Sequence, residues 1–136
     1  MKKLLNKKNN KGFSLVELIV VVLIMGIIAV ALAPQVMKWV GTSKEKTDDS
    51  NKAALKSSVQ MALADWQVDH PLPASGTDAT FTVDSAGAFT EGSNATAWAG
   101  LKDKIDEVTA EDYPKPQAAS SFTIKVSGGT GKVEVN

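Results

Sequence analysis

Residues 11–34 read KGFSLVELIVVVLIMGIIAVALAP, and this stretch decides the fold. The 21 residues from Phe13 to Ala33 carry a single charged side chain, that of Glu17. As an α-helix rising about 1.5 Å per residue, they would be about 31 Å long, enough to cross a hydrocarbon layer of roughly 30 Å. The sequence therefore predicts an apolar helix of membrane-spanning length close to the N-terminus.

The residues before this helix are basic and polar, and they carry no acid. Five of the chain's 15 lysines lie among them, namely Lys2, Lys3, Lys7, Lys8 and Lys11. Because lysines that precede an apolar span stay on the cytoplasmic side, the rest of the chain is expected to face outward. That remainder has ten lysines against 15 acids, a formal charge of −5, which argues against a protein that binds nucleic acid.

An alternative interpretation of the N-terminus is a secretory signal peptide. Two small-x-small sequences, Ala29–Ala31 and Ala31–Ala33, fit the cleavage pattern of such peptides. However, the apolar run exceeds the roughly 7–15 residues typical of them, and Pro34 should hinder cleavage at the second sequence. A carboxylate within a membrane segment also costs up to about 3 kcal/mol and usually marks a function. Glu17 therefore favours a retained helix with a specific role.

The residues KGFSLVEL, Lys11–Leu18, resemble the processing signal of type IV pilins and the related pseudopilins. That signal consists of a short basic leader, a Gly, a Phe, and a Glu four residues after the Phe. The resemblance continues to Gly26 and Pro34, where similar pilins also carry a Gly and a Pro, and it covers roughly the first forty residues. The C-terminal two-thirds of the chain has no motif that matches the family.

The resemblance implies processing and assembly roles for three residues. A membrane-embedded prepilin peptidase would cut between Gly12 and Phe13 and methylate the new amino group of Phe13. A residue without a Cβ at position 12 lets a protease approach the backbone closely. In the assembled fibre, Glu17 of one subunit would face the Phe13 ammonium of a neighbour, and this pair would fix the axial register. The apolar surface of Leu15–Leu32 would hold the bundle together.

Gly26 and Pro34 predict a weak segment within the apolar helix. Proline has no N–H and crowds the carbonyl of Val30, four residues back, so a kink between Gly26 and Pro34 is expected. Such kinks are also tolerated in ordinary membrane helices. The resemblance implies in addition that this segment unwinds in the assembled fibre.

A second helical stretch is predicted from Pro34 to about Val68. Its apolar positions share one face: Val36, Val40, Leu55, Val59, Leu63 and Trp66. The polar run Thr42–Lys56 between them alternates in charge, as on a solvated surface. The prolines of His70–Pro73 should end this helix, because residues before proline avoid helical geometry. His70 is expected to be a polar residue at the helix end rather than a catalytic base.

Beyond Pro73 the pattern changes to short strands. Phe81 and Val83 alternate with polar residues, and Ser85–Gly87 predicts a turn before a second strand, Ala88–Thr90. Either Ser93 or Asn94 is expected to cap a short helix with a spaced apolar face, made of Trp98, Leu101, Ile105 and Val108.

The end of the chain is the clearest β pattern. Phe122–Val126 and Val133–Val135 alternate around the turn Gly128–Gly131, which predicts a hairpin whose apolar face the amphipathic helix would cover. The predicted fold class is α+β: a long N-terminal helix, apolar in its first half and amphipathic in its second, packed on a small antiparallel sheet, as in pilins. The predicted divisions are a cleaved leader (1–12), a transmembrane and assembly helix (13–34), and a helix continuation with a β-rich head (35–136).

The composition argues against most enzymes and metal sites. The chain has no cysteine and a single histidine, which excludes thiolate sites and disfavours histidine-based metal sites and triads. No helix follows Gly128–Gly131 to make it a phosphate loop. A solvated helix face, rather than the calcium site of related pseudopilins, is expected for the acids Asp103, Asp106, Glu107, Glu111 and Asp112. We therefore expect no enzymatic activity, no cofactor and no metal.

These observations favour a structural protein, the repeating subunit of a bacterial type IV pilus that supports adhesion, motility or aggregation. The expected partners are further copies of the chain, the prepilin peptidase and the pilus assembly machinery in the membrane, with no direct contact to nucleic acid. The chain would begin as a single-pass protein of the cytoplasmic membrane with its N-terminus in the cytoplasm. It would then become part of a cell-surface or extracellular filament.

Two alternatives stay open at the level of sequence. A major pseudopilin of a type II secretion or DNA-uptake system would share the N-terminal pattern, although the sequence has no convincing calcium loop near its C-terminus. A small secreted or membrane-tethered binding module or enzyme would require the Gly12–Phe13 pattern to be a coincidence. The lack of cysteine also departs from pilins that close a C-terminal loop with a disulfide, which puts that loop's receptor-binding role in doubt.

Overall fold

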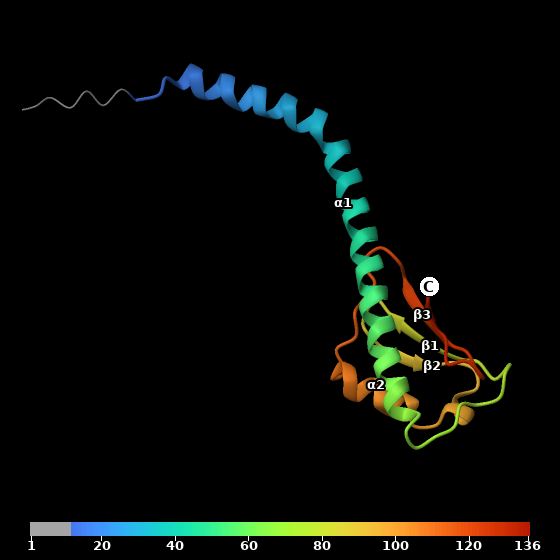
Figure 1. Ribbon diagram of the computed structural model, residues 1–136. Coiled ribbons are helices and arrows are strands. Elements are labelled where there is room, and N and C mark those ends of the chain that lie inside the picture. The colour runs from blue at the N-terminus through green and yellow to red at the C-terminus, as the bar shows by residue number, and fades with distance from the viewer. Residues whose placement is uncertain (1–11) are drawn as a thin grey trace, which may run out of the picture. The chain divides into compact units, whose positions relative to one another are not determined.

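The computed structural model describes residues 12–136 of the chain (Figure 1). The predicted basic leader lies outside the described residues, apart from Gly12. The chain divides into two structural units, the first ending at Trp39 and the second comprising Val40–Asn136. One helix, α1 (Leu15–Trp66), contributes residues to both units.

The first unit consists of the N-terminal part of α1, which Figure 1 draws in blue to cyan. Every residue from Leu15 to Trp39 is exposed. Within the described part of the chain, α1 is the one helix long and apolar enough to cross a membrane, and none of its most apolar 18-residue window is buried. The predicted apolar helix is therefore confirmed. Pro34 lies inside α1, where it has no N–H to donate to the carbonyl of Val30.

The second unit is built on a four-stranded antiparallel sheet. Its strands lie in the order β2 (Phe89–Glu91), β1 (Ala79–Asp84), β3 (Ser121–Val126) and β4 (Val133–Val135). In the central pair, Phe81 of β1 is opposite Ile124 of β3, and Val83 is opposite Phe122. The predicted turn before β2 and the predicted C-terminal hairpin are both confirmed.

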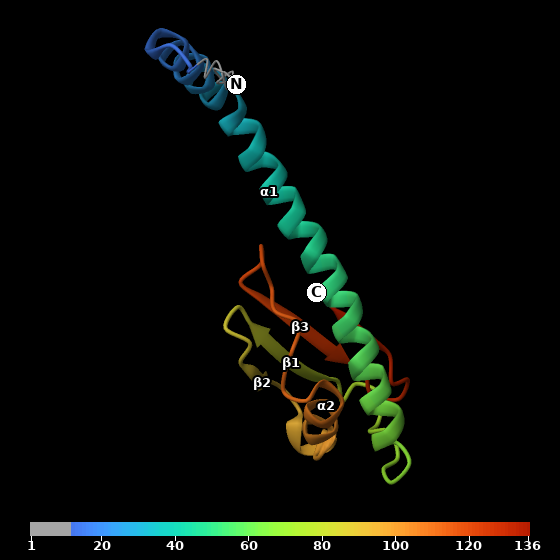
Figure 2. The same ribbon diagram turned by 90° about the vertical axis from the view of Figure 1, so that its left-hand side faces the viewer.

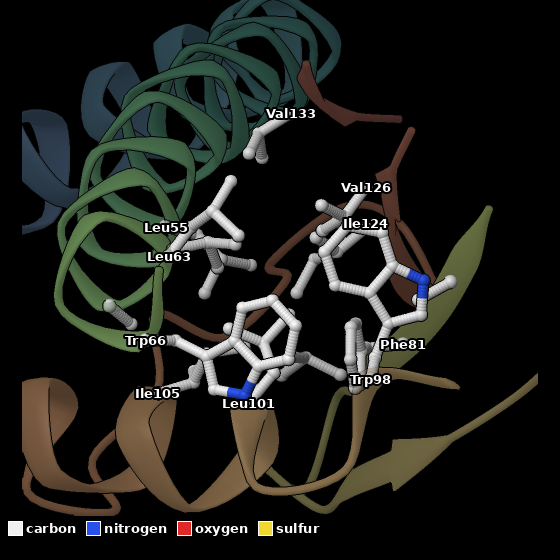
Figure 3. Close-up of a cluster of buried hydrophobic side chains, with 14 of the residues drawn as sticks. Leu55, Leu63, Trp66, Phe81, Trp98, Leu101, Ile105, Ile124, Val126 and Val133 are labelled. Atoms are coloured by element: carbon white, nitrogen blue, oxygen red, sulfur yellow. The ribbon is translucent and has the colours of Figure 1, made fainter. Parts of the chain in front are cut away.

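The core of the second unit forms where alternate residues of the sheet meet the apolar face of α1 (Figures 2 and 3). Leu55, Leu63 and Trp66 of α1 point toward the sheet side chains in Figure 3. The side chains without exposed surface come from both helices and both central strands: Leu55, Val59, Ala62, Ala79, Val83, Leu101, Ile105, Phe122, Ile124 and Val126. Burying a large aliphatic or aromatic side chain contributes roughly 1.5–3 kcal/mol, so this cluster accounts for the packing of the unit. The predicted α+β fold class is confirmed.

Two buried tryptophans tie connecting segments to the core. The Trp66 indole N–H donates to the carbonyl oxygen of Ala99 at 3.0 Å, and the Trp98 indole N–H donates to that of Thr77 at 2.7 Å. The two indole rings stack with their centroids 5.4 Å apart. A buried indole N–H needs an acceptor, and both find one in a loop backbone. The segment before α2 is thereby fixed to α1, and the loop before β1 is fixed to Trp98, whose ring stacks on Trp66 of α1.

The helix expected between Asn94 and Val108 is interrupted. A single 3₁₀ turn, η1 (Ala95–Trp98), is separated from α2 (Leu101–Thr109) by Gly100, whose φ of +82° lies in the left-handed region. Glycine adopts that conformation without steric cost, so it breaks the helix in two. Asn94 precedes η1 but does not cap it with its side chain, which donates from Nδ2 to the carbonyl of Asp78 at 2.7 Å.

The buried face of α1 is shorter than its apolar periodicity predicts. The sequence places Val36 and Val40 on that face, but their side chains are 48% and 49% exposed. The apolar core positions of α1 begin at Leu55, where the helix meets the sheet. The helix ends at Trp66, two residues before the expected end, and Val68 is exposed.

Candidate functional site

The predicted processing site lies immediately before α1. Gly12, Phe13 and Ser14 are outside the helix, and the Phe13 side chain is 90% exposed. A Cβ placed on Gly12 would meet none of the described atoms within 4 Å. The described part of the chain therefore gives no steric reason for a glycine at this position.

Ser14 and Glu17 form a reciprocal cap at the start of α1. The Val16 N–H donates to Ser14 Oγ at 3.3 Å, and the Ser14 N–H donates to Glu17 Oε2 at 2.8 Å. This Ser-x-x-Glu arrangement is a variant of the capping box in which the serine hydroxyl accepts from Val16 rather than from Glu17, and it satisfies N–H groups that have no partner in the first helical turn. The carboxylate also lies at the positive end of the helix dipole, where negative charge is stabilised. Glu17 thus already has a local structural role within one chain.

The rest of the first unit presents an extended apolar surface. Its exposed large side chains are Leu15, Val16, Leu18, Ile19, Val20, Val21, Val22, Leu23, Ile24, Met25, Ile27, Ile28, Val30, Leu32, Val36, Met37 and Trp39. Glu17 is the only acidic residue between Phe13 and Lys44. Soluble monomers rarely expose apolar patches of more than a few hundred Å², so this surface requires a cover of lipid or protein.

Gly26 and Pro34 both lie within α1, eight positions apart and away from the processing site. A Cβ on Gly26 would meet no described atom within 4 Å, so packing within the described chain does not demand glycine there. Glycine in a helix interior costs about 1 kcal/mol relative to alanine, and proline removes one backbone hydrogen bond. These two residues therefore weaken the helix locally, and the predicted kink stays a prediction.

A second polar site lies in the second unit at Asp48 of α1. Its side chain is 5% exposed, and Oδ1 accepts one backbone N–H while Oδ2 accepts two. The donors are Gln117 at 2.5 Å, Ala118 at 2.9 Å and Ala119 at 2.8 Å. One turn further along α1, Asn51 Nδ2 donates to the carbonyl of Lys115 at 2.8 Å. These bonds fasten the segment between α2 and β3 to α1, which corrects the expectation that Thr42–Lys56 is uniformly solvated.

The electrostatics of Asp48 follow from these contacts. Burial of the carboxylate is the largest single influence and by itself would raise its pKa. The hydrogen bonds from the N–H groups of Ala119, Gln117 and Ala118, aided by the charge of Lys52, together outweigh it, so the pKa of Asp48 is lowered from its ordinary value. Asp48 is therefore ionised at neutral pH, and its charge is held by backbone donors.

The other polar clusters of the second unit have structural roles. Asp106 of α2 accepts hydrogen bonds from the Tyr113 hydroxyl and, at 2.5 Å, from Lys102 Nζ. Burial, followed by this bond to Asp106, raises the pKa of the Tyr113 hydroxyl. At the end of α1, His70 stacks on Trp66 with ring centroids 4.7 Å apart, and its Nδ1 lies 3.1 Å from the Trp66 carbonyl oxygen. His70 thus lies at the helix end, where the sequence predicts it.

The acids singled out as possible calcium ligands lie on α2 and in the residues that follow it. Asp103 and Glu107 are exposed, as expected of a solvated helix face, whereas Asp106 is engaged by Lys102 and Tyr113. Across residues 12–136, no group of three or more His, Asp or Glu side chains is arranged to hold a metal ion. Gly128–Gly131 forms the turn between β3 and β4.

The sequence contains a signal for one of these two polar contacts, the Ser14 cap, but not for the other, the Asp48 contact. The Ser14 cap has a sequence signal, because a serine followed three residues later by a glutamate marks a helix start. Asp48 has none, because its donors are about seventy residues away and the surrounding charges alternate like those of an exposed helix.

Comparison with known proteins finds a family match in the same N-terminal region that holds the predicted processing site and the apolar helix. Residues 7–33 match the family model of the prokaryotic N-terminal methylation motif. Prepilin peptidase-dependent protein A of Clostridium perfringens (strain 13 / Type A) is 34% identical over 125 residues, a match that covers 90% of this chain and 83% of that protein. No solved structure matches the chain. The similarity to this relative extends beyond the motif into the second structural unit.

Proposed function

We propose, since the chain belongs to the family of type IV pilin-like proteins, that it is the repeating structural subunit of a bacterial type IV pilus. The filament would serve adhesion, motility or aggregation, and the subunit would do no chemistry of its own. The observation that carries the proposal is the extended apolar surface of the first unit, interrupted near its start by one acid, directly after an exposed Gly12–Phe13 bond.

Processing occurs between Gly12 and Phe13 in this proposal, and the new amino group of Phe13 is then methylated. Three observations support it. The bond lies outside α1, the Phe13 side chain is exposed, and a protease could approach Gly12 without meeting a Cβ. The relative from Clostridium perfringens is named for its dependence on a prepilin peptidase, and the same enzyme class is the proposed partner here.

Glu17 of one subunit then pairs with the Phe13 ammonium of its neighbour. A lone carboxylate among apolar helices is costly unless it finds a partner, and the new amino terminus is a cation of the right sign at the same end of the helix. The Ser14 N–H engages Oε2 of Glu17, but a carboxylate accepts about four hydrogen bonds in total. The inter-subunit pair can therefore form without breaking the cap. Its contribution is to the register between subunits.

The apolar surface supplies the cohesion of the filament. Before assembly the acyl chains of the cytoplasmic membrane cover it, and the positive leader keeps the N-terminus on the cytoplasmic side. Once the subunit leaves the bilayer, each aliphatic side chain left in water would cost roughly 1.5–3 kcal/mol. Packing against further copies of the same helix removes that cost. The assembly machinery in the membrane would move subunits between these two environments.

Gly26 and Pro34 make the intervening segment the part of α1 most easily unwound in the filament. We expect amide hydrogen exchange in assembled filaments to be faster for residues 26–34 than for residues 15–25, since the weaker segment lacks one backbone bond and contains a glycine. Mass spectrometry of exchanged filaments with peptide resolution would measure this. Equal protection along both segments would contradict the expectation.

Electron microscopy of sheared surface material, combined with mass spectrometry of its N-terminus, tests the proposed function. A methylated N-terminus at Phe13 in material that forms long filaments is the expected result. A start near Leu32 or Pro34 would mean ordinary secretion and would overturn the proposal. Short fibres confined to the cell envelope, with the same methylated terminus, would instead identify a pseudopilin of a secretion or DNA-uptake system.

A further inference from the structure

We propose that Ser14 is a positioning residue for cleavage of the Gly12–Phe13 bond, because its hydroxyl keeps the helix from engaging the scissile carbonyl. This inference rests on the proposed processing at that bond. It adds to that processing a role for a residue downstream of the bond that is cut.

The hydrogen bonds at the start of α1 carry the inference. An α-helix pairs the N–H of each residue with the carbonyl four residues earlier, so the Val16 N–H is the natural partner of the Gly12 carbonyl. Here the Val16 N–H donates to Ser14 Oγ at 3.3 Å instead. The backbone ladder begins with Leu18 N–H, which donates to the Ser14 carbonyl at 3.2 Å. The helix therefore starts two residues after the scissile carbonyl.

The chemistry of hydrolysis requires that carbonyl. Water adds to the carbonyl carbon of Gly12, the bond from that carbon to the Phe13 nitrogen breaks, Gly12 leaves as a carboxylate, and the nitrogen gains protons to become an ammonium. Negative charge develops on the Gly12 carbonyl oxygen, and a protease stabilises it with its own donors. An oxygen already bonded to the Val16 N–H and enclosed in a helical turn would be less accessible to those donors.

The residue at position 14 decides where the helix begins. Serine is among the strongest N-cap residues, whereas alanine is the best residue for a helix interior. With alanine at position 14, the Val16 N–H loses the Oγ acceptor and α1 is free to extend toward Gly12. The loss of a typical N-cap shifts the balance between the two helix starts by about five-fold.

Cleavage of the full-length chain in membrane vesicles by a prepilin peptidase tests the proposal. The initial rate for Ser14→Ala should fall by up to about five-fold, and Ser14→Thr, which keeps a hydroxyl acceptor, should restore it. Ser50→Ala, which removes an exposed hydroxyl from α1 far from the bond, should be cleaved at the original rate. In the same samples, the ¹³C shift of the Gly12 carbonyl should move toward helical values in Ser14→Ala alone.

Two outcomes would overturn the proposal. One is cleavage of Ser14→Ala at the original rate, and the other is slower cleavage with no change in the Gly12 carbonyl shift or no recovery in Ser14→Thr. Failure of the unaltered chain to be cut between Gly12 and Phe13 would instead overturn the proposed function, so the two failures are distinguishable.

Discussion

Replacing Glu17 with alanine is expected to abolish filaments while leaving membrane insertion and cleavage at Gly12–Phe13 largely intact. Insertion depends on the apolar run, which the substitution makes more apolar. In the filament, however, the Phe13 ammonium would lie among aliphatic side chains without a counter-charge. Because removing one partner of a buried ion pair is strongly destabilising, the equilibrium for subunit addition should fall about a hundredfold or more.

Glu17→Gln separates the charge from the cap. Glutamine keeps an oxygen that can accept the Ser14 N–H, as glutamate does in the structure, but it carries no charge. If the inter-subunit ion pair is what matters, this variant should fail to assemble as completely as Glu17→Ala. Should Glu17→Gln assemble normally, the cap and not the charge would be the essential function of the residue.

Filament yield by electron microscopy, measured beside the fraction of cleaved chain in the membrane, distinguishes these outcomes. Glu45→Ala is the matched control, because it removes an exposed acid from α1 beyond the apolar segment. Its filament yield should equal that of the unaltered chain. Normal filaments from Glu17→Ala would show that the ion pair is dispensable.

The second large effect is expected at Asp48, where alanine should lower the midpoint of thermal unfolding of the second unit by roughly 5–10 °C. Three backbone N–H groups, those of Gln117, Ala118 and Ala119, would lose their acceptor at once. Asparagine at this position would rescue them only in part, since it keeps one acceptor oxygen and would direct its NH₂ group toward the remaining backbone donors. The Asp48→Asn variant should therefore also be destabilised. Tryptophan fluorescence of the intact chain in detergent micelles would follow the transition.

Asp49 provides the control for this experiment. It is the next residue in α1 and also an acid, but it is exposed. Asp49→Ala should change the unfolding midpoint little, as is usual for exposed surface positions. An equal loss in the two variants would mean that the helix charge pattern, and not the carboxylate–backbone contact, stabilises the unit.

The Asp48 contribution should also depend on pH with a definite sign. The folded-state pKa of Asp48 lies below its unfolded value of about 3.9. Its stabilising contribution is therefore fully present above about pH 4 and is lost as the pH falls through the folded-state pKa. The difference in unfolding midpoint between the unaltered chain and Asp48→Ala should shrink below about pH 4. A difference that stayed constant from about pH 7 to about pH 2 would contradict the assignment.

The features that sequence reasoning predicts well are those fixed by local composition. The apolar run after Phe13 can form little but a long exposed helix, and the alternation in Phe122–Val126 and Val133–Val135 specifies paired strands. The glycines of the Gly128–Gly131 turn allow the tight reversal between them, which is why the predicted hairpin is confirmed.

The features that sequence reasoning misses depend on distant or competing contacts. The break at Gly100 arises because one glycine in a left-handed conformation overrides a helical periodicity that runs across it. The burial of Asp48 depends on a loop that only tertiary folding brings to α1. Val36 and Val40 keep the right spacing for a buried face, but both side chains are exposed in the described structure. The spacing of apolar residues does not show which part of a helix other elements cover.

Among the described residues, every member of the apolar core belongs to Leu55 or a later position. In the proposed assembly, the segment that would exchange acyl chains for neighbouring copies thus contributes nothing to that core. On that proposal, a subunit could complete the folding of its globular part while still anchored, and extraction from the bilayer would not need to undo any of it. Covering the apolar helix and folding the globular part would then depend on different stretches of one polypeptide.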